Sequence, residues 1–156
     1  MAHKIRTVIQ ITGSAEHVWE VLTDFDSWPE WNAADPGFSG SLKEGAKVEL
    51  TSATPTGKTQ NLKIKLTVVD PSRQLTWESG LPLLFKARHT FRIQAEEGGC
   101  TVHNDAFFRG LLVPFIRGQL LTETMFRETN RGLKRRAESG EGGENQVRRD
   151  DDRSIR

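Results

Sequence analysis

The sequence predicts an α+β domain. We expect an antiparallel sheet of about seven strands, two short helices after its first strand, and a long C-terminal helix across its apolar face. Apolar and polar side chains alternate through most of residues 37–108, as is typical of strands with one wet face. The turns between these segments are short, which favours antiparallel neighbours. From about Leu111 to Ala137 apolar residues keep helical spacing after Pro114, which indicates the long helix.

Length and composition suit one domain without a nucleic-acid partner. The chain has 156 residues, and its 22 Lys and Arg nearly balance its 21 Asp and Glu, so net charge gives no argument for nucleic-acid binding. Cys100 is the single cysteine, which excludes an internal disulfide and fits a reducing compartment. The sequence has no apolar run of signal-peptide or membrane-span length. We therefore expect a soluble, cytoplasmic protein.

The chain divides into residues 1–137 and a polar end. In residues 138–156 the only large apolar side chains are Val147 and Ile155. Such a segment cannot offset its ordering entropy by burial, so we expect a disordered polar tail. Residues 1–137 contain no linker and no repeat, and we interpret them as one domain.

The N-terminal segment predicts a strand and then two short helices. Ile5, Ile9 and Ile11 alternate with polar residues and indicate a strand buried on one face. Ser14 is placed to cap the first helix. The apolar stripe of that helix consists of Ala15, Val18, Trp19 and Leu22. A second helical segment holds Trp28, Pro29 and Trp31, with Ser27 as its cap.

Turn signals divide the middle of the chain into further strands. These cover residues 37–42, 46–53, 58–69, 73–79, 84–96 and 100–108. The inner, apolar face is expected to hold Val48, Leu50, Ser52, Leu62, Ile64, Leu66, Val68, Leu75, Trp77, Ser79, Phe85, Ala87, His89, Phe91, Ile93, Val102, Asn104, Ala106 and Phe108. The wet face is expected to hold Lys47, Glu49, Lys63, Lys65, Thr67, Lys86, Arg88, Arg92 and Asp105.

Three segments carry a resemblance to a known family. The first is residues 14–24 (SAEHVWEVLTD), which is followed by residues 28–32 (WPEWN). The second runs from Trp77 to residues 89–91 (HTF), and the third is residues 108–114 (FRGLLVP). Over residues 3–137 the chain resembles the polyketide cyclase/dehydrase and lipid transport superfamily, also called SRPBCC, START-like or Bet v 1-like domains. The resemblance implies a helix-grip fold, in which a curved sheet wraps the C-terminal helix and leaves a cavity between them.

The apolar inner face and its neighbours supply candidate ligand-binding residues. We expect the cavity to be lined by Phe25, Trp28, Leu50, Ile64, Leu66, Trp77, Phe85, His89, Phe91, Asn104, Phe108, Phe115 and Met125. The alternative for each apolar member is a plain core position, since burial stabilises the fold with or without a ligand. Trp28 is expected at the rim of the cavity, with Phe25 and Phe38 as further rim candidates, whereas Trp31 is expected to pack against the sheet.

His89 and Asn104 are the polar side chains on the inner face that could orient a ligand carbonyl or hydroxyl. Alternatively, each binds a buried water or a backbone group. The same two residues are the catalytic candidates if the protein is an enzyme. An enzyme needs an internal acid, base or activated nucleophile, and the predicted inner face contains no Asp, Glu, Lys or Tyr. The sequence therefore favours binding over catalysis.

No metal or cofactor motif stands out. His3, His17, His89 and His103 lack the spacing of metal ligands, and Cys100 and His103 are expected on opposite faces of one strand. No phosphate-binding or dinucleotide-binding glycine pattern is present. We expect no metal and no cofactor.

Three hypotheses of function remain at this point. The first is binding or carriage of a small hydrophobic molecule, such as a lipid, an isoprenoid or a polyketide-like aromatic. The second is a polyketide cyclase or dehydratase-like enzyme with His89 as acid or base. The third is an interaction module without a small ligand that works through the basic end of the last helix and the tail. That basic end would suit a membrane surface or an acidic partner. That end carries Arg117, Arg127, Arg131, Lys134, Arg135 and Arg136, and its alternative is a solvated helix face. The oligomeric state is open.

Overall fold

The computed structural model describes residues 2–116 and 120–154, with side chains described as far as residue 139. No helix in these ranges is long and apolar enough to cross a membrane. In chain order the elements are β1 (Ala2–Ile11), α1 (Ala15–Thr23), the 3-10 helix η1 (Phe25–Ser27), α2 (Trp28–Trp31), β2 (Gly37–Ser39), β3 (Lys47–Ala53), β4 (Thr59–Asp70), β5 (Gln74–Leu81), β6 (Phe85–Glu96), β7 (Gly99–Arg109), α3 (Val113–Ile116) and α4 (Glu123–Ser154).

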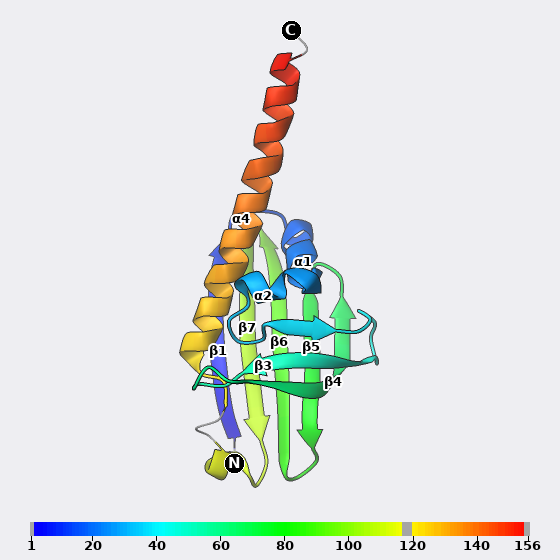
Figure 1. Ribbon diagram of the computed structural model, residues 1–156, viewed down its shortest axis with the longest axis vertical. Helices are drawn as coiled ribbons and strands as arrows, with labels where there is room; N and C mark the ends of the chain where they lie inside the picture. The colour runs from blue at the N-terminus through cyan, green and yellow to red at the C-terminus, as the bar shows by residue number, and fades with distance from the viewer. Residues whose placement is uncertain (1, 117–119, 155–156) are drawn as a thin grey trace.

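The strands form one antiparallel sheet of seven strands in the order β1-β7-β6-β5-β4-β3-β2. Figure 1 shows β2 and β3 crossing in front of the other strands, so the sheet is strongly curved. Helix α4 packs along β1 and contacts α1 and α2. The predicted α+β helix-grip architecture is confirmed.

The first helix begins as the sequence predicts. The side chain of Ser14 accepts a hydrogen bond from the backbone N–H of His17, and the four predicted apolar positions of α1 are buried. Ser27 differs from expectation because its side chain makes no capping bond to α2. Its hydroxyl instead donates to the carbonyl of Asp24 and accepts from the indole N–H of Trp31.

Strand β4 contains a bulge that simple alternation does not predict. Leu66 pairs with Trp77, but Val68 pairs with Thr76, so one extra residue is accommodated between them. Val69 then lies opposite Leu75 and packs against the core. The expectation that Val68 belongs to the inner face is therefore wrong, since the bulge shifts the alternation by one residue.

The predicted single helix over residues 111–137 is wrong in its first part. A short helix, α3, ends at Ile116, and α4 begins only at Glu123. The new start has a capping residue, Thr122, whose hydroxyl accepts from the backbone N–H of Met125 at 3.3 Å. Thr122 followed by an acidic first turn is an ordinary helix-start signal that spacing of apolar residues alone does not detect.

The middle of α4 is held to the first strand by its charged side chains. The ammonium of Lys134 donates to the carbonyl of Gln10 at 2.9 Å, and Glu138 accepts from the backbone N–H of Thr12 at 3.1 Å. Hydrogen bonds from Lys134 and Thr12 hold the pKa of Glu138 below its ordinary value. Helix α4 extends to Ser154, but the side chains of residues 140–156 lie outside the described part, so the tail of residues 138–156 stays a prediction.

Two groups of buried apolar residues form the core. The larger joins α1 and α2 to strands β3 to β7, with Trp28 fully buried at its centre. The indole N–H of Trp28 donates to the carbonyl of Leu22 at 2.8 Å. The smaller group contains Ile5, Ala34, Ala106, Phe108, Val113, Leu120 and Phe126.

A glycine sets the distance between α4 and α2. A Cβ atom added to Gly132 would lie 2.1 Å from the carbonyl oxygen of Trp31, which is backbone and cannot rotate away. Alanine is favoured over glycine inside a helix by about 0.5–1 kcal/mol, but overpacking costs about 1–3 kcal/mol. The close approach of the two helices therefore depends on a missing side chain.

We expect Gly132→Ala to lower the free energy of unfolding by about 1–2 kcal/mol, because the clash outweighs the gain in helix propensity. Urea denaturation measures this change. Arg131→Ala is the matched control, since Arg131 is exposed on the same turn and its replacement leaves the free energy of unfolding nearly unchanged. A Gly132→Ala protein as stable as the parent would show that α4 is not held this close.

Candidate functional site

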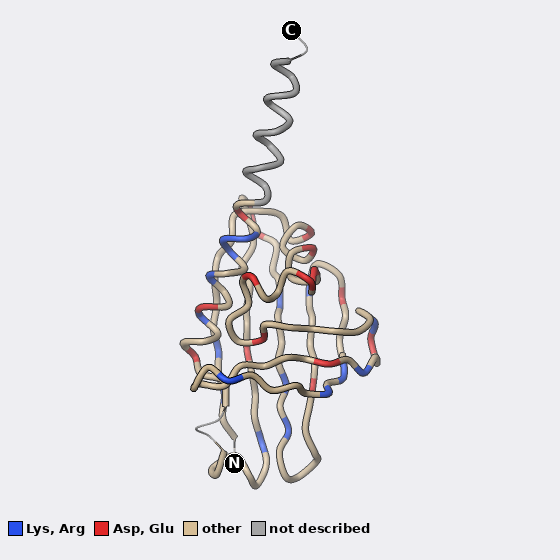
Figure 2. Tube along the Cα trace, in the orientation of Figure 1, with Lys and Arg blue, Asp and Glu red and all other residues tan. Residues whose placement is uncertain are grey.

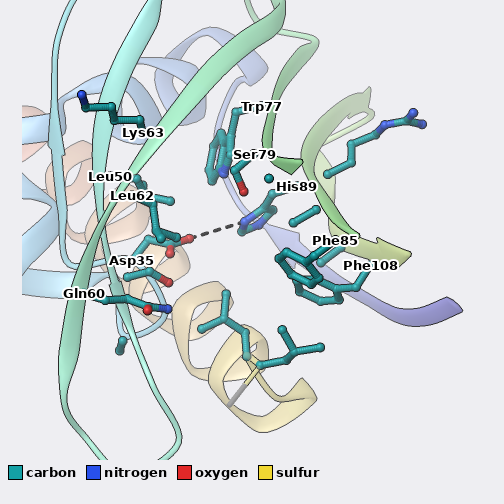
Figure 3. A pocket seen from close by; sticks show the side chains of 18 of the residues that line it. Asp35, Leu50, Gln60, Leu62, Lys63, Trp77, Ser79, Phe85, His89 and Phe108 are labelled. Atoms are coloured by element: carbon teal, nitrogen blue, oxygen red, sulfur yellow. Dashed lines mark ion pairs between the residues drawn. The ribbon is translucent and has the colours of Figure 1, made fainter. Parts of the chain in front are cut away.

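A cavity of about 290 Å³ lies between the two groups of core residues. Its walls are mostly apolar and come from strands β3 to β7, the loop before β2, and the segment between α3 and α4. The lining residues are Asp35, Leu50, Ser52, Ala53, Gln60, Leu62, Lys63, Trp77, Ser79, Gly80, Phe85, Ala87, Arg88, His89, Ala106, Phe108, Ile116, Leu120 and Leu121. Figure 3 shows Asp35 and His89 facing one another across this space, with Phe85 and Phe108 on the far side of His89.

Part of the predicted ligand-binding set lines the cavity. Leu50, Trp77, Phe85, His89 and Phe108 are all among its walls. They are brought together because they share the inner face of the curved sheet, which alternation detects. Whether they contact a ligand stays a prediction.

Other members of the set lie elsewhere. Ile64, Leu66 and Phe91 are buried in the core, and Phe25 stacks on Phe38 with ring centroids 3.7 Å apart. Trp28 is fully buried, so the expectation that it forms the rim is wrong.

The two candidates from the last helix also lie outside the cavity wall. Met125 packs against the smaller core group. Phe115 is 82 % exposed and outside the cavity wall, so the expectation that it lines the cavity is wrong. It belongs to α3, which precedes the break before α4, whereas Ile116, Leu120 and Leu121 line the cavity from this region.

The most informative residue of the site is one that the sequence did not single out. Asp35 lies in the loop between α2 and β2, lines the cavity and is 1 % exposed. Neither oxygen of its carboxylate accepts a hydrogen bond from the described residues. A buried carboxylate without hydrogen bonds is costly to the fold. Such a group is a candidate for function.

The loop that carries Asp35 is held by polar contacts to α4. The side-chain oxygen of Asn32 accepts from the backbone N–H of Asp35 at 2.9 Å and from the hydroxyl of Thr129 at 3.1 Å. The Thr129 oxygen in turn accepts from the backbone N–H of Ala34 at 3.0 Å. The local signal for this turn is Asn32 three residues before Asp35, since Asn side chains commonly hold such turns.

His89 lies directly beside Asp35. Its Nδ1 is 3.4 Å from Oδ2 of Asp35, within ion-pair distance but without hydrogen-bond geometry, and both side chains are buried. The imidazole ring is stacked on Phe126 and tilted against Trp77, with centroids 4.7 and 4.4 Å away. These aromatic neighbours fix the plane of the ring.

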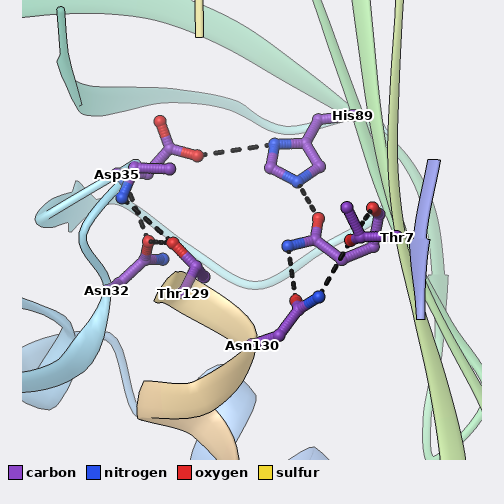
Figure 4. A network of polar contacts seen from close by, with 8 residues as sticks. Thr7, Asn32, Asp35, His89, Thr129 and Asn130 are labelled. Carbon is purple, nitrogen blue, oxygen red and sulfur yellow. Dashed lines mark hydrogen bonds and ion pairs between the residues drawn. The ribbon is translucent and has the colours of Figure 1, made fainter. Parts of the chain in front are cut away.

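A chain of hydrogen bonds decides which nitrogen of His89 carries a proton (Figure 4). The hydroxyl of Thr7 lies 2.6 Å from the backbone carbonyl of Asn104, which can only accept, so Thr7 donates its single proton there. The Thr7 oxygen must then accept from the side-chain NH₂ of Asn130 at 2.8 Å. The Asn130 oxygen accepts from the NH₂ of Asn104 at 2.9 Å, which leaves the Asn104 oxygen 2.5 Å from Nε2 of His89.

This direction requires a proton on Nε2 of His89 and turns Nδ1 toward Asp35. If both Nδ1 and Oδ2 lacked a proton, two acceptors would face each other at 3.4 Å. A proton on either Nδ1 or Oδ2 would remove this conflict. Both polar atoms of the Asn104 amide are bonded within this chain, so Asn104 positions His89 and does not line the cavity.

Comparison with known proteins agrees with this architecture. The family model for polyketide cyclase/dehydrase and lipid transport matches residues 2–138. The resemblance stated from the sequence is confirmed. A search of curated proteins finds no significant match.

Solved structures with the same fold are distant in sequence. The protein DR_A0006 of Deinococcus radiodurans is 18% identical at a TM-score of 0.64, covering 88% of this chain and 98% of its own. Norcoclaurine synthase of Thalictrum flavum is 13% identical at 0.67, with 90% and 97% covered. The di-domain ARO/CYC protein StfQ of the steffimycin pathway is 12% identical at 0.67, with 91% of this chain and 53% of StfQ covered. At these identities the likeness concerns the fold.

We expect nitrogen-15 NMR of the histidine side chains to show His89 protonated at Nε2, with slow exchange of that proton because it is buried against Asn104. His103 lies on the wet face of β7 and serves as the internal control, with a proton that exchanges rapidly. Thr7→Val removes the donor that sets the direction of the chain and is expected to mix the two tautomers of His89. A His89 protonated only at Nδ1 in the parent protein would contradict this assignment.

Proposed function

The chain belongs to the polyketide cyclase/dehydrase and lipid transport family, and we propose that it binds one small, largely apolar molecule in the cavity beside His89. The observation that carries the proposal is a mostly apolar cavity with the buried Asp35–His89 pair at one point of its wall. Binding sites for small molecules commonly combine apolar walls with few convergent polar groups.

The polar pair narrows the class of ligand. A proton on either member of the Asp35–His89 pair can be donated to a ligand oxygen, and Ser52, Ser79 and Gln60 add neutral polar groups to the walls. The ligand that fits is an apolar frame, such as an isoprenoid, a fatty chain or a polyketide-like aromatic, with one carbonyl or hydroxyl oxygen. Binding and carriage of such a molecule are the first reading of the site.

Ligand binding is tested with a cavity-filling variant. Ala87 lines the cavity, so Ala87→Phe is expected to abolish the fluorescence gain of the neutral dye phenylnaphthylamine and the melting shift produced by oxygenated apolar ligands. At about 100 times its dissociation constant a ligand stabilises the parent by about 2.7 kcal/mol, or roughly 5–10 °C. Ala95→Phe on the same strand is the control, because Ala95 is exposed and outside the cavity. Equal dye binding by both variants would place the ligand elsewhere.

A second candidate function is proton-transfer catalysis in the same cavity, favoured by the buried carboxylate of Asp35. Both of its oxygens are buried without a hydrogen bond from the described residues, and Asp35 belongs to the cavity wall. A general base must reach the proton that it removes, and an unbonded carboxylate oxygen is available for this. The synthase and the ARO/CYC protein that share the fold make an enzyme compatible with this scaffold.

The pair supports loss of water from a β-hydroxy carbonyl compound, with every transferred proton coming from the substrate or from the pair itself. Asp35 takes the proton from the α-carbon, the C–O bond breaks as the C=C bond forms, and Nδ1 of His89 gives its proton to the departing hydroxyl. The pair then holds one proton on Asp35 and returns it to Nδ1 across 3.4 Å. The chain of Thr7, Asn130 and Asn104 occupies Nε2, so Nδ1 is the ring nitrogen left to act on the substrate.

Nitrobenzisoxazole tests this chemistry without knowledge of the natural substrate. A base removes its ring C–H proton while the N–O bond breaks and a coloured phenolate forms. We expect Asp35→Asn to lower turnover at least about 100-fold, since general-base catalysis contributes about 10²–10⁴-fold. His103→Gln is the control, because His103 lies on the wet face of the sheet. Turnover unchanged in Asp35→Asn would remove the catalytic proposal and leave ligand binding untouched.

A further inference from the structure

Large apolar side chains are exposed together at one end of the sheet. Leu83 and Phe115 are 84 % and 82 % exposed, and four leucines beside them are also exposed. We call this group the apolar tip, and it consists of Leu81, Leu83, Leu84, Leu111, Leu112 and Phe115. It comprises the β5–β6 turn and the β7–α3 connection, which Figure 1 shows at the lower end of the molecule. Single exposed apolar residues are ordinary, whereas a contiguous group marks an interaction surface.

The apolar tip is built as one unit. The backbone N–H groups of Leu111 and Leu112 donate to the carbonyls of Leu83 and Leu84 at 3.0 and 2.9 Å. Gly110 makes this contact possible, because a Cβ atom there would lie 2.4 Å from the Leu84 carbonyl oxygen. The two loops therefore present their side chains in a fixed arrangement.

Leu83 is unfavourable for the isolated fold in two respects. Its backbone φ of 69° lies in the left-handed region, where glycine or asparagine is favoured over leucine. Its side chain also gains almost no burial at 84 % exposure. A strained backbone that displays an exposed leucine indicates that the side chain is used in contact with something outside the chain.

The surroundings of the apolar tip are cationic. Residues 79–88 and 106–116 contain Lys86, Arg88 and Arg109 but no Asp or Glu. Lys86 and Arg109 lie directly opposite each other on β6 and β7, an arrangement that like charges disfavour. Glu78 bonds with Lys86 and Arg88, whereas Arg109 forms no ion pair with any described residue. Figure 2 shows the two lower loops without acidic positions and basic positions on the strands above them.

We propose that the apolar tip inserts into the surface of an anionic lipid bilayer. Its leucines and Phe115 would enter the boundary between headgroups and acyl chains, while Arg109 contacts the headgroups. A bilayer is favoured over a protein partner because side chains that project from two turns at the end of a sheet form a convex surface. A fluid bilayer surrounds such a surface, whereas a folded partner needs a matching groove.

The position of the apolar tip relates it to the cavity. Gly80 and Phe85 lie beside the β5–β6 turn and Ile116 follows Phe115, and all three line the cavity. Docking at this tip would therefore bring the cavity wall to the lipid surface. The basic end of α4 is less suited to this role, because Arg127, Lys134 and Arg136 are each paired with a glutamate.

Vesicle co-sedimentation tests the proposal with the whole chain. The probe is a set of vesicles of phosphatidylcholine alone or with about one third phosphatidylglycerol. We expect the parent to bind the anionic vesicles and the Leu83→Asp, Phe115→Asp double variant to lose at least about tenfold in affinity. Asp tolerates the left-handed backbone of residue 83, so the variant keeps its fold, which circular dichroism checks. Val8→Asp is the matched control, since Val8 is 59 % exposed on β1 away from the tip.

The cationic part of the proposal has its own pair of variants. Arg109→Gln is expected to reduce the preference for anionic vesicles. Arg92→Gln is the control and is expected to leave this preference unchanged, because Arg92 is exposed on the same face of the sheet but distant from the tip. Absence of binding to any vesicle, or binding equal in the parent and the double variant, would overturn the proposal. A parent that dimerises in solution and becomes monomeric in the double variant would also overturn it, by assigning the tip to a second copy. None of these outcomes depends on whether the cavity holds a ligand.

Discussion

Asn130 is the residue on which the arrangement of sheet, helix and cavity depends. From α4 it donates to Thr7 on β1 and accepts from Asn104 on β7, so one side chain joins the helix to two strands. The backbone carbonyl of Asn104 fixes the direction of every bond in this chain, since it can only accept. The same contacts that seat the helix therefore also set the tautomer of His89 at the cavity wall.

The cavity exists because the core is not continuous. Trp28, Trp77 and their neighbours fill one end, and Phe108, Phe126 and Leu120 fill the other. Between them lie Asp35 and His89, together with an Asn32 NH₂ that has no partner among the described residues. Buried polar groups without partners lower stability, and proteins retain them mainly at functional sites. Burial of the aromatic core therefore offsets the stability that the unpartnered polar groups of the site cost.

Alternation and capping signals were enough to predict most of the scaffold. The period of two placed Leu50, Trp77, His89 and Phe108 on one face, because strand geometry leaves no other choice. Asp35 escaped prediction because its role comes from a loop, and a loop residue approaches a site only through contacts such as those of Asn32 and Thr129. Phe115 was misplaced because helical spacing continues across a break that the Thr122 cap creates.

By itself the sequence determined the α+β class, the family, the first helix and the apolar face of the sheet. The class, the helix and the apolar face follow from local preferences and short-range periodicity, whereas the family follows from the resemblance of its motifs to a known superfamily. Only the tertiary structure decided that Asp35 meets His89, that Asn104 supports the imidazole, and that two distant loops share one exposed apolar tip. Each of these depends on residues far apart in the chain, whose approach is set by the curvature of the sheet and the packing of α4.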